Sequence, residues 1–148
     1  MKNPIKTILK AGFIAGLLDG IAAVFILAKM KFHTTFQFIA SGIFGKSAFG
    51  NNEMMVIYGI FIHFMIAIAF AAFFFLIYKK LPLKNQPVII GLFYGIFIWL
   101  VMNLCILPFS NIPPSPFTTI SVIKGMAILM VCVGLPISLI VSKNYEAK

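Results

Sequence analysis

Four polar or ionisable side chains lie inside long apolar segments of this chain, and their types suit them best to chemistry: Asp19, His63, Asn103 and Lys124. Each belongs to a different apolar segment. At about 1.5 Å of rise per helical residue, we expect all four at depths of roughly 7 to 13 Å from the same membrane face. Charged side chains in hydrocarbon are costly, so they normally face the interior of a helix bundle. The spacing therefore predicts one polar cluster shared by four helices.

Several pairings are open within this cluster. Asp19 can pair with Lys124 or accept a hydrogen bond from His63, and Asn103 can donate and accept between helices. A carboxylate beside an imidazole is also the smallest set of groups for proton-linked behaviour, because histidine titrates near physiological pH. Structural roles are the alternative: Asn103 can join helices, Lys124 can extend to the membrane surface, and His63 can be a hydrogen-bonded packing residue.

Other site chemistries find little support. A zinc site lacks suitably spaced ligands, and a haem would need His33 and His63, which we expect at different depths. No Ser-His-Asp arrangement is evident. Cys105 and Cys132 lie within apolar segments and are expected to pack as small apolar side chains. The sequence predicts no catalytic residue, no metal site and no cofactor.

The elements that must position these side chains are four apolar spans and one short helix. The 148-residue chain is 61% hydrophobic with a mean hydropathy of +1.07, whereas a soluble domain is about half apolar. We expect the whole chain to form a single all-α membrane domain. The apolar segments predict transmembrane helices over residues 8–28, 55–78, 87–107 and 116–141. Pro136 should kink the last of them.

Glycines recur at four-residue spacing on two of these spans: Gly12, Gly16 and Gly20 on the first, and Gly91 and Gly95 on the third. This pattern leaves a strip of bare backbone that another helix can approach closely. Packing within the chain is the simpler expectation. A homo-oligomer or a partner membrane helix is the alternative.

The loop between the first two spans is expected to carry a short amphipathic helix at about residues 35–45. Its apolar face follows the i, i+3, i+4, i+7, i+8 pattern and consists of Phe36, Ile39, Ala40, Ile43 and Phe44. Gly45 can end the helix. It is too short to cross a membrane, so we expect it on the membrane surface or folded over the mouth of the bundle. Residues 40–47 resemble a loosened phosphate-binding loop. No α/β domain accompanies them, so nucleotide binding is not expected.

Charge predicts the orientation in the membrane. Twelve lysines against three acidic residues give a net charge of +9, with no arginine. Most lysines lie on the side of the predicted bundle that holds both termini, so the positive-inside rule places the termini in the cytoplasm. Without arginine, bidentate phosphate contacts are lacking and nucleic-acid binding is not expected. Asp19, Lys29 and Lys31 argue that the first span is retained rather than cleaved as a signal peptide.

Five segments together resemble a known group of proteins: GLLDG at 16–20, QFIASGIFG at 37–45, IHFMIAIAFA at 62–71, GLFYG at 91–95 and MNLCILP at 102–108. They resemble the YagU-like family of small bacterial inner-membrane proteins, over about residues 12–140. The resemblance implies a four-helix protein of the bacterial inner membrane and brings no established activity. Three of its motif positions lie in the first loop, namely Gln37, Ser41 and Gly42. The others are Asp19, His63, Asn103 and Pro108.

Three functions are open at this point. The favoured one is a non-enzymatic membrane protein that binds or conducts a small solute or a proton through an outward-facing polar cluster. The first alternative is an accessory subunit that acts through its glycine-lined helix contacts. The second is a small membrane enzyme that uses Asp19 and His63 as acid and base. General acid–base work needs hydrogen-bond reach, so a separation beyond about 8 Å would exclude that enzyme.

Overall fold

The computed structural model describes residues 3–27, 29, 31–81, 85–112 and 118–146, and every regular element in these ranges is helical. The α-helices are α1 (Pro4–Ala22), α2 (Phe32–Phe44), α3 (Glu53–Ile77), α4 (Pro87–Leu100), α5 (Thr119–Ile128) and α6 (Leu135–Glu146). Three π-helical segments are η1 (Ala23–Leu27), η4 (Val101–Ile106) and η6 (Leu129–Gly134). Three short 3₁₀ segments are η2 (Gly45–Ala48), η3 (Tyr78–Lys80) and η5 (Leu107–Phe109).

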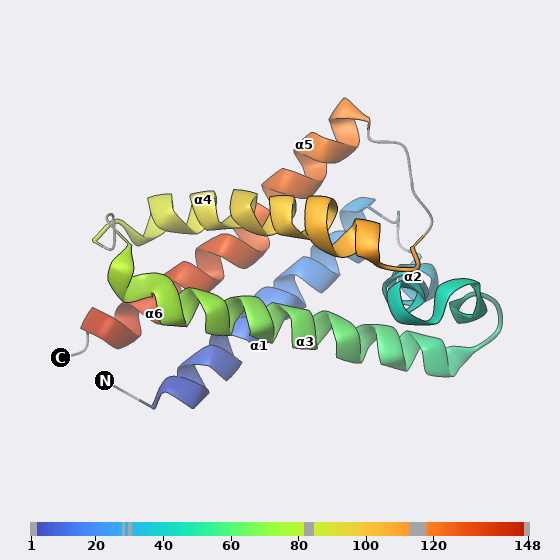
Figure 1. Ribbon diagram of the computed structural model, residues 1–148, viewed down its shortest axis with the longest axis horizontal. Coiled ribbons are helices and arrows are strands. Elements are labelled where there is room, and N and C mark those ends of the chain that lie inside the picture. Colours follow the sequence, from blue (N-terminus) through green and yellow to red (C-terminus); the bar gives the residue numbers. More distant parts are fainter. Residues whose placement is uncertain (1–2, 28, 30, 82–84, 113–117, 147–148) are drawn as a thin grey trace.

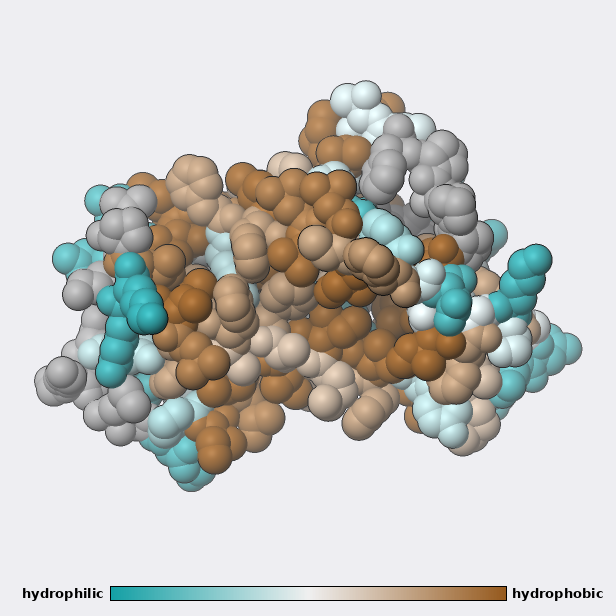
Figure 2. All heavy atoms as spheres, in the orientation of Figure 1, coloured by the Kyte–Doolittle hydropathy of each residue, from teal (hydrophilic) through white to brown (hydrophobic). Residues whose placement is uncertain are grey.

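Four helical segments in the described ranges are long and apolar enough to cross a membrane: Pro4–Ile26, Glu53–Lys80, Pro87–Phe109 and Thr119–Tyr145. The four predicted helices are thereby confirmed, with ends that move by a few residues. The first residues of the predicted fourth span, 116 and 117, lie outside the described residues. Figure 2 shows hydrophobic residues over the middle of the molecule and hydrophilic residues at its two ends. This distribution fits a multi-pass membrane protein.

The helix starts follow from local chemistry. The side chain of Asn3 accepts hydrogen bonds from the backbone of Ile5 and Lys6, at 3.0 and 3.4 Å, and so caps α1. A capping box between Thr118 and Ser121 starts α5, in which each side chain bonds the backbone N–H of the other residue.

The spans pack in an arrangement that brings both termini to one end of the bundle (Figure 1). α1 lies along α3, and α4 lies along η6 and α6. The half of the bundle nearest the termini holds the main hydrophobic core, in which Phe74, Ile98 and Ile137 are almost completely buried. The hydroxyl of Tyr94 donates to the carbonyl of Phe70 at 2.7 Å within this core. The terminal half of the molecule is therefore densely packed.

At the opposite end, α2 folds over the bundle and packs against α3 (Figure 1). The helix was predicted at 35–45 and begins three residues earlier, at Phe32. Its buried face also differs from the predicted apolar face. Phe36 and Ala40 are buried as expected, but Ile43 and Phe44 are exposed. Two polar residues, Gln37 and Ser41, are buried in their place, because hydrogen bonds satisfy them. Two positions were predicted for this helix, on the membrane surface or over the mouth of the bundle. In the structure it lies over the mouth of the bundle.

Three spans leave regular α-helical geometry: η1 ends the first, η4 lies in the last turns of the third, and η6 lies in the middle of the fourth. Pro136 was predicted to kink the fourth span, and η6 ends two residues before it. Proline lacks a backbone N–H, which disturbs the hydrogen-bond ladder of the preceding turn. Pro108 lies in η5, the last turn of the third span.

Candidate functional site

The glycines of α1 bring that helix into close contact with α3. A Cβ atom added at Gly12 would lie 2.6 Å from Cα of Ile68, and one added at Gly16 would lie 2.9 Å from the ring of Phe64. One added at Gly20 would lie 3.3 Å from Nε2 of His63. All three glycines of the first span therefore face α3 of the same chain. This close approach carries His63 up to the backbone of α1.

His63 bonds the backbone of α1 and lies beside Asp19. Its Nε2 is 2.8 Å from the carbonyl oxygen of Gly16 and 4.0 Å from Oδ2 of Asp19. Because a carbonyl oxygen only accepts, Nε2 carries the proton and donates it to Gly16. The separation from Asp19 is too long for a hydrogen bond, so the contact is electrostatic. Both side chains are largely enclosed, with exposed fractions of 11% for His63 and 21% for Asp19.

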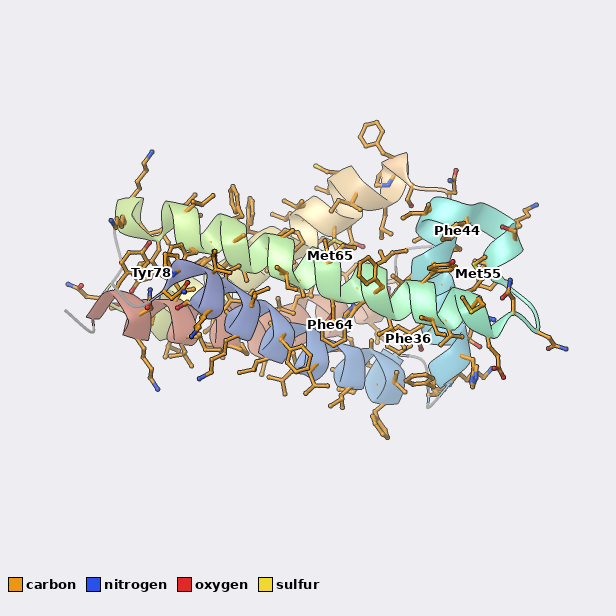
Figure 3. The ribbon with its side chains drawn as sticks, turned by 90° about the horizontal axis from the view of Figure 1, so that it is seen from below. Phe36, Phe44, Met55, Phe64, Met65 and Tyr78 are labelled. Carbon is orange, nitrogen blue, oxygen red and sulfur yellow. The ribbon has the colours of Figure 1, made fainter. Side chains whose placement is uncertain are left out.

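Aromatic rings surround the imidazole. Phe36 of α2 and Phe64 of α3 both meet the His63 ring edge-on, with centroids 6.1 and 5.6 Å away. Figure 3 places these two phenylalanines beside the contact between α1 and α3, while Met55 and Tyr78 mark opposite ends of α3. His63 thus sits in an apolar setting, with one hydrogen bond and one nearby charge.

Asp19 faces a cavity of about 620 Å³ beneath α2. All four spans and α2 contribute to its wall. Most of the lining is aliphatic or aromatic. Four lining residues other than Trp99 bear polar side chains: Asp19, Asn103, Ser110 and Ser121.

His63 lines a different and smaller pocket. This second pocket has a volume of about 250 Å³ and is bounded by α1, α2 and α3, with Phe32 and Phe36 in its wall. The contact between Asp19 and His63 therefore lies between two pockets. The carboxylate belongs to the larger one and the imidazole to the smaller one.

Asn103 lines the larger cavity from η4. Its Nδ2 donates to the carbonyl oxygen of Trp99 at 2.9 Å, one turn earlier in the same span. The bond satisfies a carbonyl at the point where α4 passes into the π-helical segment, whose hydrogen bonds are shifted by one residue. The bond described for Asn103 thus lies within its own span, although the residue had been considered as a link between helices.

Lys124 does not join the cluster. Its side chain is exposed on α5, and it is not part of the cavity wall, whereas its neighbours Val122 and Gly125 are. The pairing of Asp19 with Lys124 considered from the sequence is wrong for the described structure. Depth along the helix predicted that Lys124 lies level with the cavity, as its neighbours do. Its position around the helix axis, however, directs its side chain away from the cavity wall.

Of the three loop positions, Gln37 and Gly42 bond α2 to neighbouring segments. Nε2 of Gln37 donates to the carbonyl of Gly50 at 2.8 Å, and the carbonyl of Gly42 accepts from the backbone of Asn111 at 3.0 Å. The buried hydroxyl of Ser41 donates to the carbonyl of Phe38 at 2.6 Å, within α2 itself. Gln37 and Gly42 therefore position the cover of the cavity, and of the three only Gly42 lines it.

The glycines of the third span also meet a helix of the same chain. A Cβ added at Gly95 would lie against Cα of Met130, and one added at Gly91 would lie 3.0 Å from the carbonyl oxygen of Gly134. Ser138 of α6 adds a hydrogen bond of 2.7 Å to the carbonyl of Pro87. The glycine faces that could have served a homo-oligomer are therefore occupied within the chain.

Three positioning residues escaped the sequence reasoning: Gly59, Asn111 and Gly134. A Cβ at Gly59 would lie against the carbonyl oxygen of Phe36, and one at Gly134 against the carbonyl of Gly91. Nδ2 of Asn111 donates to the carbonyl of Ile43 at 3.0 Å. Gly59 is the only glycine in the second span, and that isolation was the one available signal.

Comparison of the chain with protein-family models, with curated proteins and with solved structures found no match. The resemblance to YagU-like proteins stays a prediction. Function is therefore inferred from the geometry of the site alone.

Proposed function

We propose that this chain is an integral membrane protein that binds a small, largely apolar molecule in the cavity beneath α2, with Asp19 as the polar anchor. The observation that carries this proposal is the cavity itself: about 620 Å³, walled by all four spans and containing the carboxylate. Ligand sites in proteins typically measure about 300 to 1,000 Å³ and combine apolar walls with a few placed polar groups. The cavity fits both criteria.

Binding is favoured over conduction by the packing of the other half of the bundle. Passage of a solute would need a path from the cavity to the terminal end. The described side chains along that route, among them Phe74, Ile98 and Ile137, are almost completely buried against one another. A cavity that this core closes on the side of the termini fits a binding site better than a conduit.

The contacts of His63 also favour binding over acid–base catalysis. The 4.0 Å between Asp19 and His63 is below the separation of about 8 Å that would exclude an acid–base pair, but it is beyond hydrogen-bond reach. The described contacts of His63 are the Gly16 carbonyl, two phenylalanine rings and Asp19, with no hydroxyl, thiol or amine among them for the imidazole to activate. The imidazole also lies outside the larger cavity.

For the membrane setting, we propose the bacterial inner membrane with both termini in the cytoplasm. The resemblance to YagU-like proteins supports the first part, and the lysine distribution supports the second. The α2 end then faces outward, and the cavity lies in the outer half of the bilayer. The use of the glycine faces within the chain argues against the accessory-subunit alternative.

The single tryptophan of the chain makes the proposal testable, because Trp99 lines the cavity. The probes are benzyltrimethylammonium and neopentylbenzene, which share one shape and differ in charge. Tryptophan fluorescence of the protein in lipid nanodiscs would be titrated with each probe. We expect a saturable change with at least one of them.

Two adjacent residues of α5 provide a matched pair of variants. Val122 lines the cavity, whereas Ile123 is 62% exposed and does not. Val122→Phe should fill part of the cavity and weaken binding at least about tenfold, equivalent to 1.4 kcal/mol. Ile123→Phe should bind like the wild type. An absence of saturable binding, or equal loss in both variants, would overturn the proposal.

A further inference from the structure

We propose that the ligand of this cavity is an amphiphilic organic cation, such as a quaternary or protonated amine with an apolar body, and that Asp19 binds its charge. This inference rests on the proposed function, since it names the chemical class that the same cavity selects. Its basis is the distribution of charge around the cavity together with the nature of its wall.

No basic side chain among the described lining residues faces Asp19 across the cavity. Among the described lining residues it is the only ionisable side chain, and none is a lysine or a histidine. Lys124 is exposed outside the wall. A carboxylate in surroundings of low dielectric interacts strongly with any opposite charge that reaches it. The cavity therefore favours a positive ligand over a neutral or a negative one.

His63 does not take the place of that ligand charge in the described geometry. Its Nε2 proton is used in the 2.8 Å hydrogen bond to the Gly16 carbonyl, and the carboxylate is 4.0 Å away. A neutral imidazole satisfies this bond fully. The imidazole holds α1 against α3 while the carboxylate remains available on the cavity side.

The wall favours an organic cation over a metal ion. Hard metal ions need several oxygen ligands, and no group of three or more metal-binding side chains occurs among the residues that the structure describes. The lining is instead rich in isoleucine, with Met102, Phe38 and Trp99 among the larger side chains. Aliphatic walls take up an apolar body, and aromatic rings attract alkylammonium groups through cation–π interactions.

The two probes of equal shape separate charge recognition from simple filling of the cavity. Each would be titrated against wild type, Asp19→Asn and Glu53→Gln in nanodiscs, with Trp99 fluorescence as the readout. Both variants convert a carboxylate to an amide, but Glu53 is exposed at the start of α3, outside the cavity wall. A probe also partitions into the lipid of the nanodisc, to the same extent for every variant. Each probe is compared only between variants, so this partitioning does not affect the comparison.

In Asp19→Asn we expect the affinity for benzyltrimethylammonium to fall at least about tenfold, in line with the loss of a desolvated charge pair. The affinity for neopentylbenzene should change less than about threefold, which corresponds to well under 1 kcal/mol. Glu53→Gln should leave both unchanged. His63→Gln keeps an N–H donor for the Gly16 carbonyl and removes the only base near Asp19, so it should bind the cation at least as well as the wild type.

The outcomes distinguish the two proposals. If neither probe binds in a way that Val122→Phe weakens, the binding site itself is refuted. If both probes bind the cavity but Asp19→Asn affects them equally or not at all, the site stands and the cation assignment is wrong. If the fall for the cation appears equally in Glu53→Gln, the effect is one of overall charge and the assignment is likewise wrong.

Discussion

Nε2 of His63 determines how the polar pair is used. The Gly16 carbonyl accepts its proton at 2.8 Å, and the Asp19 carboxylate lies beyond hydrogen-bond range at 4.0 Å. The histidine therefore joins two helices, while the aspartate is presented to a cavity. Two ionisable residues that are close in space thus have separate roles.

We expect His63→Phe to destabilise the fold. The substitution removes the donor to the Gly16 carbonyl, and interhelical hydrogen bonds in membrane proteins contribute about 0.6 kcal/mol on average and up to about 1.7. A loss of roughly 0.5 to 2 kcal/mol in the free energy of unfolding is expected, measured by titration with sodium dodecyl sulfate in mixed micelles. His33→Phe is the control, because His33 is exposed on α2. Equal stability of the two variants would show that the bond does not hold the helices together.

Asp19 and His63 could be singled out from the sequence because each interrupts an apolar segment. Lys124 was placed with them for the same reason, and wrongly. The rise per residue gives depth, but each residue also turns about 100° around the helix axis, and the sequence does not fix which direction faces the bundle. Whether the pair serves a ligand stays a prediction until binding is measured.

Among the elements, α2 has the most distinctive attachment. Gly59 lets its backbone approach α3 so closely that a Cβ there would lie against the carbonyl oxygen of Phe36. Gln37 and Asn111 then fix it to neighbouring loops through hydrogen bonds of 2.8 and 3.0 Å. The cover of the cavity is held by backbone contact and polar bonds as well as by apolar packing.

Gly59→Ala should therefore loosen α2 while leaving the spans in place. The added methyl group cannot be accommodated without moving Phe36, because its neighbour is backbone rather than a flexible side chain. Hydrogen–deuterium exchange should accelerate in α2 and stay close to wild type in α4. Gly42→Ala is the matched control, since its Cβ would meet Ile112 at an ordinary 3.6 Å. Unchanged exchange in Gly59→Ala would argue against this attachment.

The sequence predicted that a helix occurs in the first loop but misjudged which face it buries. An apolar period identifies residues that avoid water, and in a membrane protein such residues can face either lipid or protein. Ile43 and Phe44 are exposed, while Gln37 and Ser41 are buried with their hydrogen bonds satisfied. The π-helical segments escaped prediction as well, since a shift of one hydrogen bond barely alters an all-apolar pattern.

For the whole molecule, the two halves of the bundle differ in packing. The half near the termini is filled by the main core, and the half beneath α2 contains the cavity. The third and fourth spans also approach closely, because a Cβ at Gly134 would lie against the carbonyl of Gly91. This contact positions α4 against η6.

We expect Gly134→Ala to destabilise the whole fold by about 1 to 3 kcal/mol or more, as overpacking of a close backbone contact does. Thermal unfolding in detergent would measure the loss. In Gly125→Ala, on the same span, the new methyl group would lie 3.2 Å from Nε1 of Trp99, a side chain that can shift, so a much smaller loss is expected. The molecular mass measured by light scattering should be the same for both variants and the wild type. A change of oligomeric state in Gly134→Ala without loss of stability would contradict the intrachain role.

The four-helix architecture was predictable because a bilayer imposes length and apolarity on any segment that crosses it. The cavity was not, because it depends on how far α5 diverges from its neighbours and on where α2 lies. Figure 1 shows α5 rising away from α4. The angle between two helices depends on contacts between residues that are distant in sequence. The apolar periodicity of a single helix does not predict these contacts.

The attachment of α2 also sets an order of events during biosynthesis. Ile43 and its partner Asn111 are 68 residues apart, and Asn111 follows the whole third span. At translation rates of about 5 to 20 residues per second, several seconds separate the synthesis of the two. Throughout that interval Asp19 has already been synthesised, while α2 lacks its bond to Asn111 and the wall formed by α5 does not yet exist. The nascent protein therefore passes through an open intermediate in which its intramembrane carboxylate is unshielded, and the cavity is completed only after the fourth span has been inserted.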